Sequence, residues 1–515
     1  MDSTYVTTSI VYPNAKPHIG YAMELVQADF FARYYRLSGH SVRFVTGTDE
    51  HGLKIQQAAA KERMEPKVFV DGMAEIMQLL AKELGLSHDR FIRTTDPDHE
   101  LMAQALWRAC SASGDIYKKS YKAWYNVKEE EFLGLVEDYP DSKSFGIDPR
   151  FIEMIDEENY FFALSRYKEK IVNLLESGNY KVWPASRAQE LLNFVAEKDL
   201  LDISISREKS KLEWGIQVPG DNSQVMYVWF DALANYLTAS CSIDQQGTIL
   251  SGEFWPAQLH CIGKDISRFH GLIWPGMLLS AGLPLPKELL VHGFITSGGQ
   301  KMSKSIGNVI DPFEVIARHG PEAVRWSLLK DVSTVDDGDF TLERFEELYN
   351  ADLANDLGNL VSRVWSMVGK YCGGKVPENG VSAHAKLMVK GKWKQYHTSV
   401  ERKDIQGAVV RAHELIVWCN KRIDEVKPWA LAKNPDRQMD LYEHLYELLE
   451  VIRNATLMLT PALPITSYNI GKAMFPKADP TLASSFKIGE RWGGMVPGQP
   501  LGDQQPLLFP KDPRP

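Results

Sequence analysis

Two lysines stand three residues apart in the segment HGFITSGGQKMSKSIGNVIDP, at positions Lys301 and Lys304. Glycines flank the pair at Gly298, Gly299 and Gly307, and they predict a mobile loop. Ammonium groups on such a loop can stabilise the negative charge that grows on phosphate oxygens in a transition state. A lone pair of lysines at this spacing is more often a solvated turn. The complete pentapeptide KMSKS after an apolar strand pattern favours a loop that closes over a polyphosphate.

A second candidate anion site lies near the N-terminus, in the segment PNAKPHIG. Residues 5–12 (YVTTSIVY) predict a buried strand, and a helical pattern runs from about residue 21 to residue 37. The turn between them exposes the free N–H groups and the positive dipole end of the helix. His18 could add an imidazole donor there, or it could serve only as a helix cap. Gly20 would let a nucleotide approach the backbone closely.

Together, these two segments resemble the signature sequences of the class I aminoacyl-tRNA synthetases. The family's N-terminal signature ends in a second histidine, where this chain has Tyr21. A tyrosine hydroxyl donates a hydrogen bond but stays neutral at pH 7. The resemblance implies that His18, Lys301 and Lys304 are catalytic. It implies ATP binding by His18, Gly20, Tyr21, Gly263, Asp265, Lys301 and Lys304. Asp265 could instead, or in addition, cap the following helix.

Composition places limits on the class of protein. The chain has 515 residues, of which 44% are hydrophobic and 24% charged, and this size predicts two or three domains. The five cysteines show no CxxC pair or metal-ligand spacing, so neither a disulfide framework nor a structural zinc site is expected. A net charge of −9 argues against a wholly basic RNA-binding surface. The absence of a long apolar run or a basic leader predicts no membrane contact and a cytoplasmic location.

Alternating strand and helix patterns predict an α/β doubly wound, Rossmann-like catalytic domain of the class I synthetase type, with an inserted connective module and a following α-helical bundle. The ligand is expected where the two halves of the nucleotide fold meet. The Pro- and Gly-rich end is expected to form a surface strap anchored by Leu507, Leu508 and Phe509, or else to be disordered. The predicted units are the first half of the fold at 1–112, the insert at 113–225, the second half at 226–339, the bundle at 340–475 and the strap at 476–515.

Longer strings, GTDEHG, VWFDALANY, HCIGKDISRFH and KPWALAK, resemble the methionyl-tRNA synthetases, in a form without zinc-binding cysteines. The resemblance implies a methionine pocket, and its mostly apolar and aromatic residues suit a polarizable thioether. Asp49 would pair with the substrate ammonium, and Arg207 matches a family arginine near the substrate carboxylate. The pocket residues are Ile10, Tyr12, Asp49, Arg207, Trp229, Ala232, Leu233, Tyr236, Ile266 and His270.

The resemblance also implies a two-step ligase reaction. L-Methionine is activated with ATP, which carries Mg²⁺ on its phosphates, and is then transferred to the 3′ end of tRNA(Met). Asn359, Arg363 and Trp429 match the family's anticodon-reading positions, and their stacking and hydrogen-bonding groups suit an unstacked base. A monomer is expected. Two alternatives stay open: an adenylating or nucleotidyl-transferring enzyme with a small acceptor, and a non-catalytic RNA-binding paralogue.

Overall fold

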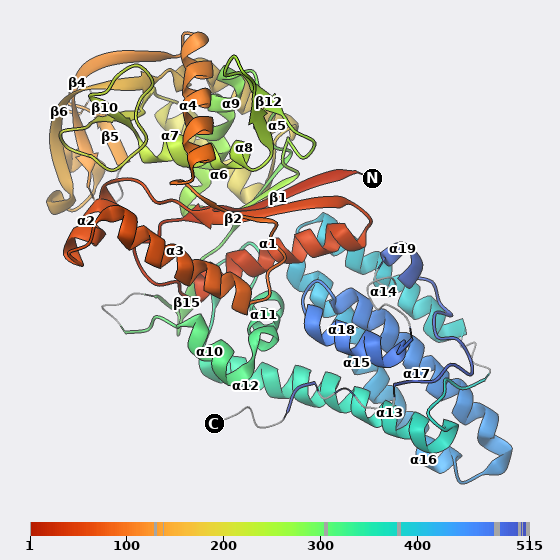
Figure 1. The fold of residues 1–515 in the computed structure, drawn as a ribbon. Coiled ribbons are helices and arrows are strands. Elements are labelled where there is room, and N and C mark those ends of the chain that lie inside the picture. Colours follow the sequence, from red (N-terminus) through yellow and green to blue (C-terminus); the bar gives the residue numbers. More distant parts are fainter. Residues whose placement is uncertain are drawn as a thin grey trace.

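A six-stranded parallel sheet is the centre of the catalytic region (Figure 1). The computed structural model describes residues 2–127, 131–136, 139–302, 307–378, 383–477, 485–502, 506 and 508–510. Among them the strands run in the order β3-β2-β1-β13-β14-β7. Their bounds are β1 Ser3–Val11, β2 Ser41–Thr48, β3 Arg90–Arg93, β7 Lys181–Trp183, β13 Leu259–Gly263 and β14 Glu288–His292. The direction of winding changes between β1 and β13, which is where doubly wound folds bind ligands. The predicted fold class is confirmed.

Helices cover both faces of this sheet, which explains why β1 is a nearly continuous buried run rather than an alternating one. On one face lie α1 (Ile19–Leu37) and α3 (Pro66–Glu83), and on the other lie α4 (Pro97–Ala112) and α9 (Trp274–Ser280) (Figure 1). α2 (Leu53–Lys61) precedes α3. The helices on the second face pack in a hydrophobic core with α8 (Asn235–Thr238), which follows α7 (Val228–Leu233).

The segment predicted as a separate insert contributes to the main sheet. β7 pairs in parallel with β14, with Val182 opposite Leu289. The prediction that 113–225 lies wholly outside the nucleotide fold is therefore wrong for β7, because a strand of three residues is too short to give a periodic signal. α6 (Ala185–Lys198) follows it, and α5 (Lys168–Ser177) precedes it.

The remainder of the insert is antiparallel. A four-stranded sheet has the order β5-β4-β6-β8, and a two-stranded ribbon joins β10 to β9. The bounds are β4 Ile116–Asn126, β5 Glu131–Leu135, β6 Ile152–Phe162, β8 Ile203–Ser204, β9 Ser206–Glu208 and β10 Gln224–Met226. A hairpin of β11 (Cys241–Ile243) and β12 (Ile249–Ser251) follows α8.

After the main sheet, a small sheet and two helices lead to the bundle. The small sheet contains β15 (Ile295–Ser297), β16 (Gln300–Lys301) and β17 (Gly338–Asp339), and the helices are α10 (Pro312–His319) and α11 (Pro321–Lys330). The bundle comprises α12 Leu342–Leu348, the π-helix η6 Tyr349–Gly358, α13 Asn359–Cys372, α14 Ala383–Glu401, α15 Ile405–Val426, α16 Pro428–Leu431, α17 Gln438–Leu459 and α18 Pro464–Met474. One hydrophobic core runs from α1 through α11 into the bundle.

The C-terminal segment lies against the bundle. The N–H of Val376 donates to the carbonyl of Gln499 at 2.9 Å, and the Tyr349 hydroxyl donates to the carbonyl of Pro510 at 2.8 Å. Phe509 packs edge-to-face on Tyr349, with ring centroids 6.1 Å apart, and Leu508 contacts the core. Leu507 lies outside the described residues. A search of the described helices finds none with the length and apolarity that crossing a membrane requires.

Candidate active site

His18 is the N-cap of α1, directly after the loop that leaves β1. Its Nδ1 accepts a hydrogen bond from the N–H of Gly20 at 3.1 Å. The ring is exposed, yet the surrounding protein desolvates it and lowers the pKa of His18. A neutral imidazole that accepts at Nδ1 carries its proton on Nε2. His18 therefore caps the helix and keeps an N–H available for a ligand, so the two roles considered for it are compatible.

Met302, in the KMSKS segment at 301–305 (here the lysine loop), lies beside this turn. The backbone N–H of Ile19 donates to the carbonyl of Ile310 at 3.1 Å. A Cβ added to Gly20 would lie 3.9 Å from the terminal methyl of Met302. Lys301 ends β16, is exposed, and has its ammonium 5.5 Å from the centre of the Phe294 ring. Lys304 lies outside the described residues. The structure thus brings together two motifs that are separated by most of the catalytic region.

A third turn borders the same place, at the end of β13. A Cβ on Gly263 would lie 2.7 Å from Oδ1 of Asp265, so a larger residue there would displace that carboxylate. Surrounding protein desolvates Asp265 and raises its pKa, while the charges of His292 and Lys301 oppose that shift. Lys264 is held by Asp337 at 2.7 Å and lies over the Phe294 ring at 4.5 Å. Phe294 therefore has one lysine near it from this third turn, Lys264, and one from the lysine loop, Lys301.

Aromatic rings meet where the residue after β1 contacts α7. Trp229 on α7 stacks on Phe269, with ring centroids 3.7 Å apart and an interplanar angle of 11°. Tyr12, which follows β1, meets Trp229 edge-on at 6.3 Å. Of the predicted pocket residues, Ile10, Tyr12, Trp229 and Ile266 are half-buried, while Ala232, Leu233, Tyr236 and His270 are buried. The first group is thus partly exposed to solvent, whereas the second belongs to the buried interior.

Two of the buried residues, Tyr236 and His270, share a hydrogen bond whose direction can be assigned. His270 Nδ1 lies 3.2 Å from the carbonyl oxygen of Ile266, so Nδ1 must carry the proton. The Tyr236 hydroxyl consequently donates to Nε2 at 2.7 Å. Burial lowers the pKa of His270 to about 4, so the ring is neutral at pH 7. The Tyr236–His270 pair is therefore uncharged at pH 7.

Asp49 is buried directly after β2, where its N–H donates to the carbonyl of Val11 at 2.9 Å. The neighbouring His51 bonds Asp231 on α7 at 2.9 Å, and His99 on α4 bonds the other oxygen of Asp231 at 3.1 Å. Burial lowers the pKa of His51, but Asp231 raises it by more. This buried ion pair fixes the Asp49 loop relative to the helix that carries Trp229.

Comparisons with known proteins indicate the family of this chain. A methionine–tRNA ligase from Brucella suis is 43% identical over 466 residues, which are 89% of each chain, and one from Rhizobium meliloti is 41% identical over 98% of each. A solved structure of Mycobacterium tuberculosis methionyl-tRNA synthetase in complex with methionyl-adenylate superposes with a TM-score of 0.90, at 37% identity over 99% of this chain and 100% of that one. The family model "tRNA synthetases class I (M)" matches residues 4–139 and 135–365. The chain belongs to this family.

Tyr21 and Arg207, which were predicted to bind ATP and methionine, are both buried. Tyr21 is only 8% exposed and packs in the hydrophobic core, where burial raises the pKa of its hydroxyl well above the usual value. Arg207 is buried at the small ribbon, with its guanidinium 4.7 Å from the Tyr227 ring and 5.1 Å from the Tyr125 ring. It donates to Ser204 at 2.9 Å. Their roles in binding ATP and methionine stay predictions.

In the bundle of the synthetase, the three predicted anticodon residues are accessible. Asn359 begins α13 and is exposed, and Arg363 lies one turn later on the same helix. Arg363 pairs with Asp424 on α15 at 2.9 Å, with 30% of its side chain exposed. Trp429 on α16 is 44% exposed, which is unusual for so large an apolar ring. An exposed indole is available for stacking on a base.

Sequence reasoning missed a buried ion pair of the synthetase beneath the signature turns. His292 Nδ1 lies 2.8 Å from the carbonyl of Gly293, and Nε2 lies 2.9 Å from Oε2 of Glu24 on α1. Both nitrogens therefore donate, so the ring is an imidazolium. Burial lowers the pKa of His292, and Glu24 raises it above the usual value. Glu24 also accepts from the N–H and hydroxyl of Ser9 at 2.8 and 2.5 Å. The sequence signal that could have indicated this ion pair is a histidine, His292, at the end of an apolar strand.

Proposed function

We propose that this synthetase is a methionine–tRNA ligase that activates L-methionine with ATP and transfers it to the 3′ end of tRNA(Met). The observation that carries the proposal is the proximity of Met302, in the KMSKS segment, to Gly20 in the His18 turn. The positive end of the α1 dipole, with the Nε2–H of His18, and a loop with cations would then face one place, as suits adenylation of a carboxylate. The similarity to methionine–tRNA ligases over nearly the whole chain supports the choice of amino acid.

In the first step, a carboxylate oxygen of methionine attacks the α-phosphorus of ATP. The bond from that phosphorus to the bridging oxygen breaks, and pyrophosphate leaves with its electron pair. His18 Nε2–H, Lys301 and Lys304 stabilise the charge on the phosphate oxygens as it develops. ATP brings Mg²⁺ on its phosphates. This chain supplies no covalent nucleophile, because positioning and charge stabilisation suffice.

Methionine is held by charged groups at its α-carbon and by mostly aromatic groups around its side chain. Asp49 accepts the ammonium, and Arg207 is assigned to the carboxylate. The thioether lies among Tyr12, Trp229 and the buried pair of Tyr236 and His270. Sulfur contacts with aromatic edges contribute about 0.3–1.5 kcal/mol each. In the second step, a ribose hydroxyl of the tRNA attacks the acyl carbon and AMP leaves. The predicted cytoplasmic location and monomeric state stay predictions.

Charging of unfractionated tRNA with labelled methionine tests the acceptor, and Trp429→Ala sharpens the test. Base stacking on an aromatic ring contributes about 1–3 kcal/mol. If Trp429 stacks on an anticodon base, the variant raises the KM for tRNA by about 5- to 150-fold, which corresponds to that energy. Pyrophosphate exchange, which needs no tRNA, is expected to be unchanged.

The matched control is Tyr468→Ala, which removes a second exposed aromatic ring of the bundle (46% exposed). It is expected to leave the KM for tRNA unchanged. Pyrophosphate exchange without any charging of tRNA by the parent protein would favour a small acceptor instead. Equal effects of the two variants on the KM for tRNA would contradict the role given to Trp429.

A further inference from the structure

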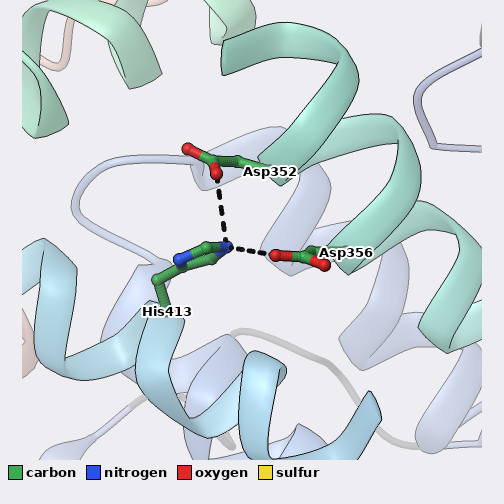
Figure 2. A group of neighbouring side chains, drawn as sticks. All are labelled: Asp352, Asp356 and His413. Carbon is green, nitrogen blue, oxygen red and sulfur yellow. Dashed lines mark ion pairs between the residues drawn. The ribbon is translucent and has the colours of Figure 1, made fainter. Parts of the chain in front are cut away.

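Two carboxylates and an imidazole converge where the π-helix η6 crosses α15 (Figure 2). Asp352 and Asp356 stand four residues apart on η6, and His413 reaches them from α15. His413 Nε2 lies 3.3 Å from Oδ2 of Asp356 and 3.8 Å from Oδ1 of Asp352. One ligand atom from each residue lies within 4.8 Å of the others. The three groups are thus arranged around a common point.

The imidazole nitrogen at the centre of this cluster lacks a hydrogen bond. His413 is only 9% exposed, and its buried Nε2 has no hydrogen-bond partner. A charged N–H···O⁻ hydrogen bond has a length of about 2.7–2.9 Å, shorter than both distances from this nitrogen. A buried polar atom without a hydrogen-bond partner destabilises the fold. A group that accepts the nitrogen lone pair and also attracts both carboxylates would remove that destabilisation.

The carboxylate of Asp352 is held in a fixed orientation by other residues. Its Oδ2 accepts from the indole N–H of Trp326 at 2.9 Å and from the ammonium of Lys330 at 2.5 Å. Its Oδ1 therefore faces His413. Hydrogen bonds of this kind commonly orient the carboxylates that bind metals. Lys330 also offsets one of the two carboxylate charges, so a single net negative charge is left to attract a cation.

We propose that Asp352, Asp356 and His413 bind one divalent metal ion of the zinc type. Ligands about 2.0–2.2 Å from Zn²⁺ at tetrahedral angles are about 3.3–3.5 Å apart. The Asp356 distance already fits this spacing, and the Asp352 distance needs a shift of a few tenths of an ångström. An imidazole ligand favours zinc-type ions over Mg²⁺ and Ca²⁺, which prefer oxygen. The cysteine spacing, which predicts no structural zinc, does not bear on a site of this composition.

The ion would join η6 to α15 immediately before α13. The side-chain N–H of Asn420 on α15 already donates to the carbonyl of Asp356 at 3.0 Å, and Arg363 of α13 pairs with Asp424 of α15. A metal bridge would fix the start of the helix that carries Asn359 and Arg363. The effect on tRNA rests on the proposed function, whereas metal binding itself does not.

Zinc binding to the full-length chain without an affinity tag tests the proposal. The protein is stripped with a chelator, titrated with Zn²⁺ in a calorimeter, and analysed for zinc after gel filtration. The variants are His413→Gln and Asp356→Asn, and the control His384→Gln removes an exposed histidine from α14. Circular dichroism and methionine-dependent pyrophosphate exchange verify that each variant folds.

We expect one zinc ion per chain in the parent and in His384→Gln. Loss of a residue that only orients a metal ligand weakens binding by about 10- to 100-fold, so loss of a ligand should weaken it by at least about 100-fold. Absence of bound zinc in the parent would overturn the proposal and leave His413 as a simple ion-pair partner. Equal affinity in the parent and in folded His413→Gln would also overturn it.

Discussion

Replacing Lys301 with alanine is expected to slow methionine-dependent exchange of pyrophosphate into ATP by about 10²- to 10³-fold, because loss of one donor to transition-state charge has an effect of this size. Lys301 is exposed beside the His18 turn, and its charge already acts on Asp265. Under the proposed function, the ammonium would lie where phosphate charge develops. The rate of exchange at saturating methionine and ATP is the quantity to measure.

The KM for methionine should stay within a few-fold of the parent value, since an interaction made only in the transition state affects kcat rather than ground-state binding. Lys304→Ala is expected to give a loss of similar size. Lys287→Ala removes an exposed lysine elsewhere on the surface and serves as the matched control. A Lys301→Ala variant with exchange equal to that of Lys287→Ala would remove this residue from the mechanism.

Replacing Arg325 with methionine is expected to lower the free energy of unfolding by about 3–5 kcal/mol, as found when one partner of a buried ion pair is removed. Arg325 is fully buried on α11, and its guanidinium lies 2.7 Å from Oδ2 of Asp29 on α1. It also donates at 2.8 Å to the carbonyls of Ala462 and Pro461, between α17 and α18. One side chain thus ties the helix that begins at His18 to the bundle.

Urea unfolding followed by circular dichroism measures the effect, and Arg318→Met, at a side chain that is 60% exposed, is the control. Acid should act on the same contact. Burial raises the pKa of Asp29, but Arg325 and Arg33 lower it by more, to about 2 from an ordinary value of 3.8. A carboxyl with a depressed folded pKa stabilises the protein above its unfolded pKa, and this contribution is lost between pH 4 and 2. Equal stabilities of the two variants at pH 7 would contradict this account.

Local patterns predicted the catalytic fold well. The buried run at 5–12, the helix ending at Leu37 and the turns at His18 and Gly263 are short-range signals, and the fold rule then places the ends of neighbouring strands together. The resemblance supplied the family. These signals have a physical basis, because a strand buried on both faces and a capped helix each need particular residues in sequence.

Other parts of the molecule depend on long-range packing, and the sequence carries little sign of them. β7 has only three residues, so no periodicity marks it. The stacking of Phe269 on Trp229 depends on a π-helical turn, whose period differs from the 3.6 residues used in reading helices. The approach of His413 to Asp352 also leaves no local sign in the sequence, because it is set by the crossing of two bundle helices.

Pyrophosphate exchange into ATP, measured with each of the twenty amino acids, tests the central claim most directly. The account predicts exchange with methionine well above background and far weaker exchange with the other nineteen, because the pocket at Tyr12 and Trp229 suits an unbranched thioether. Exchange driven mainly by a different amino acid would contradict the assigned substrate. A complete lack of exchange in a folded protein would contradict the adenylation chemistry itself.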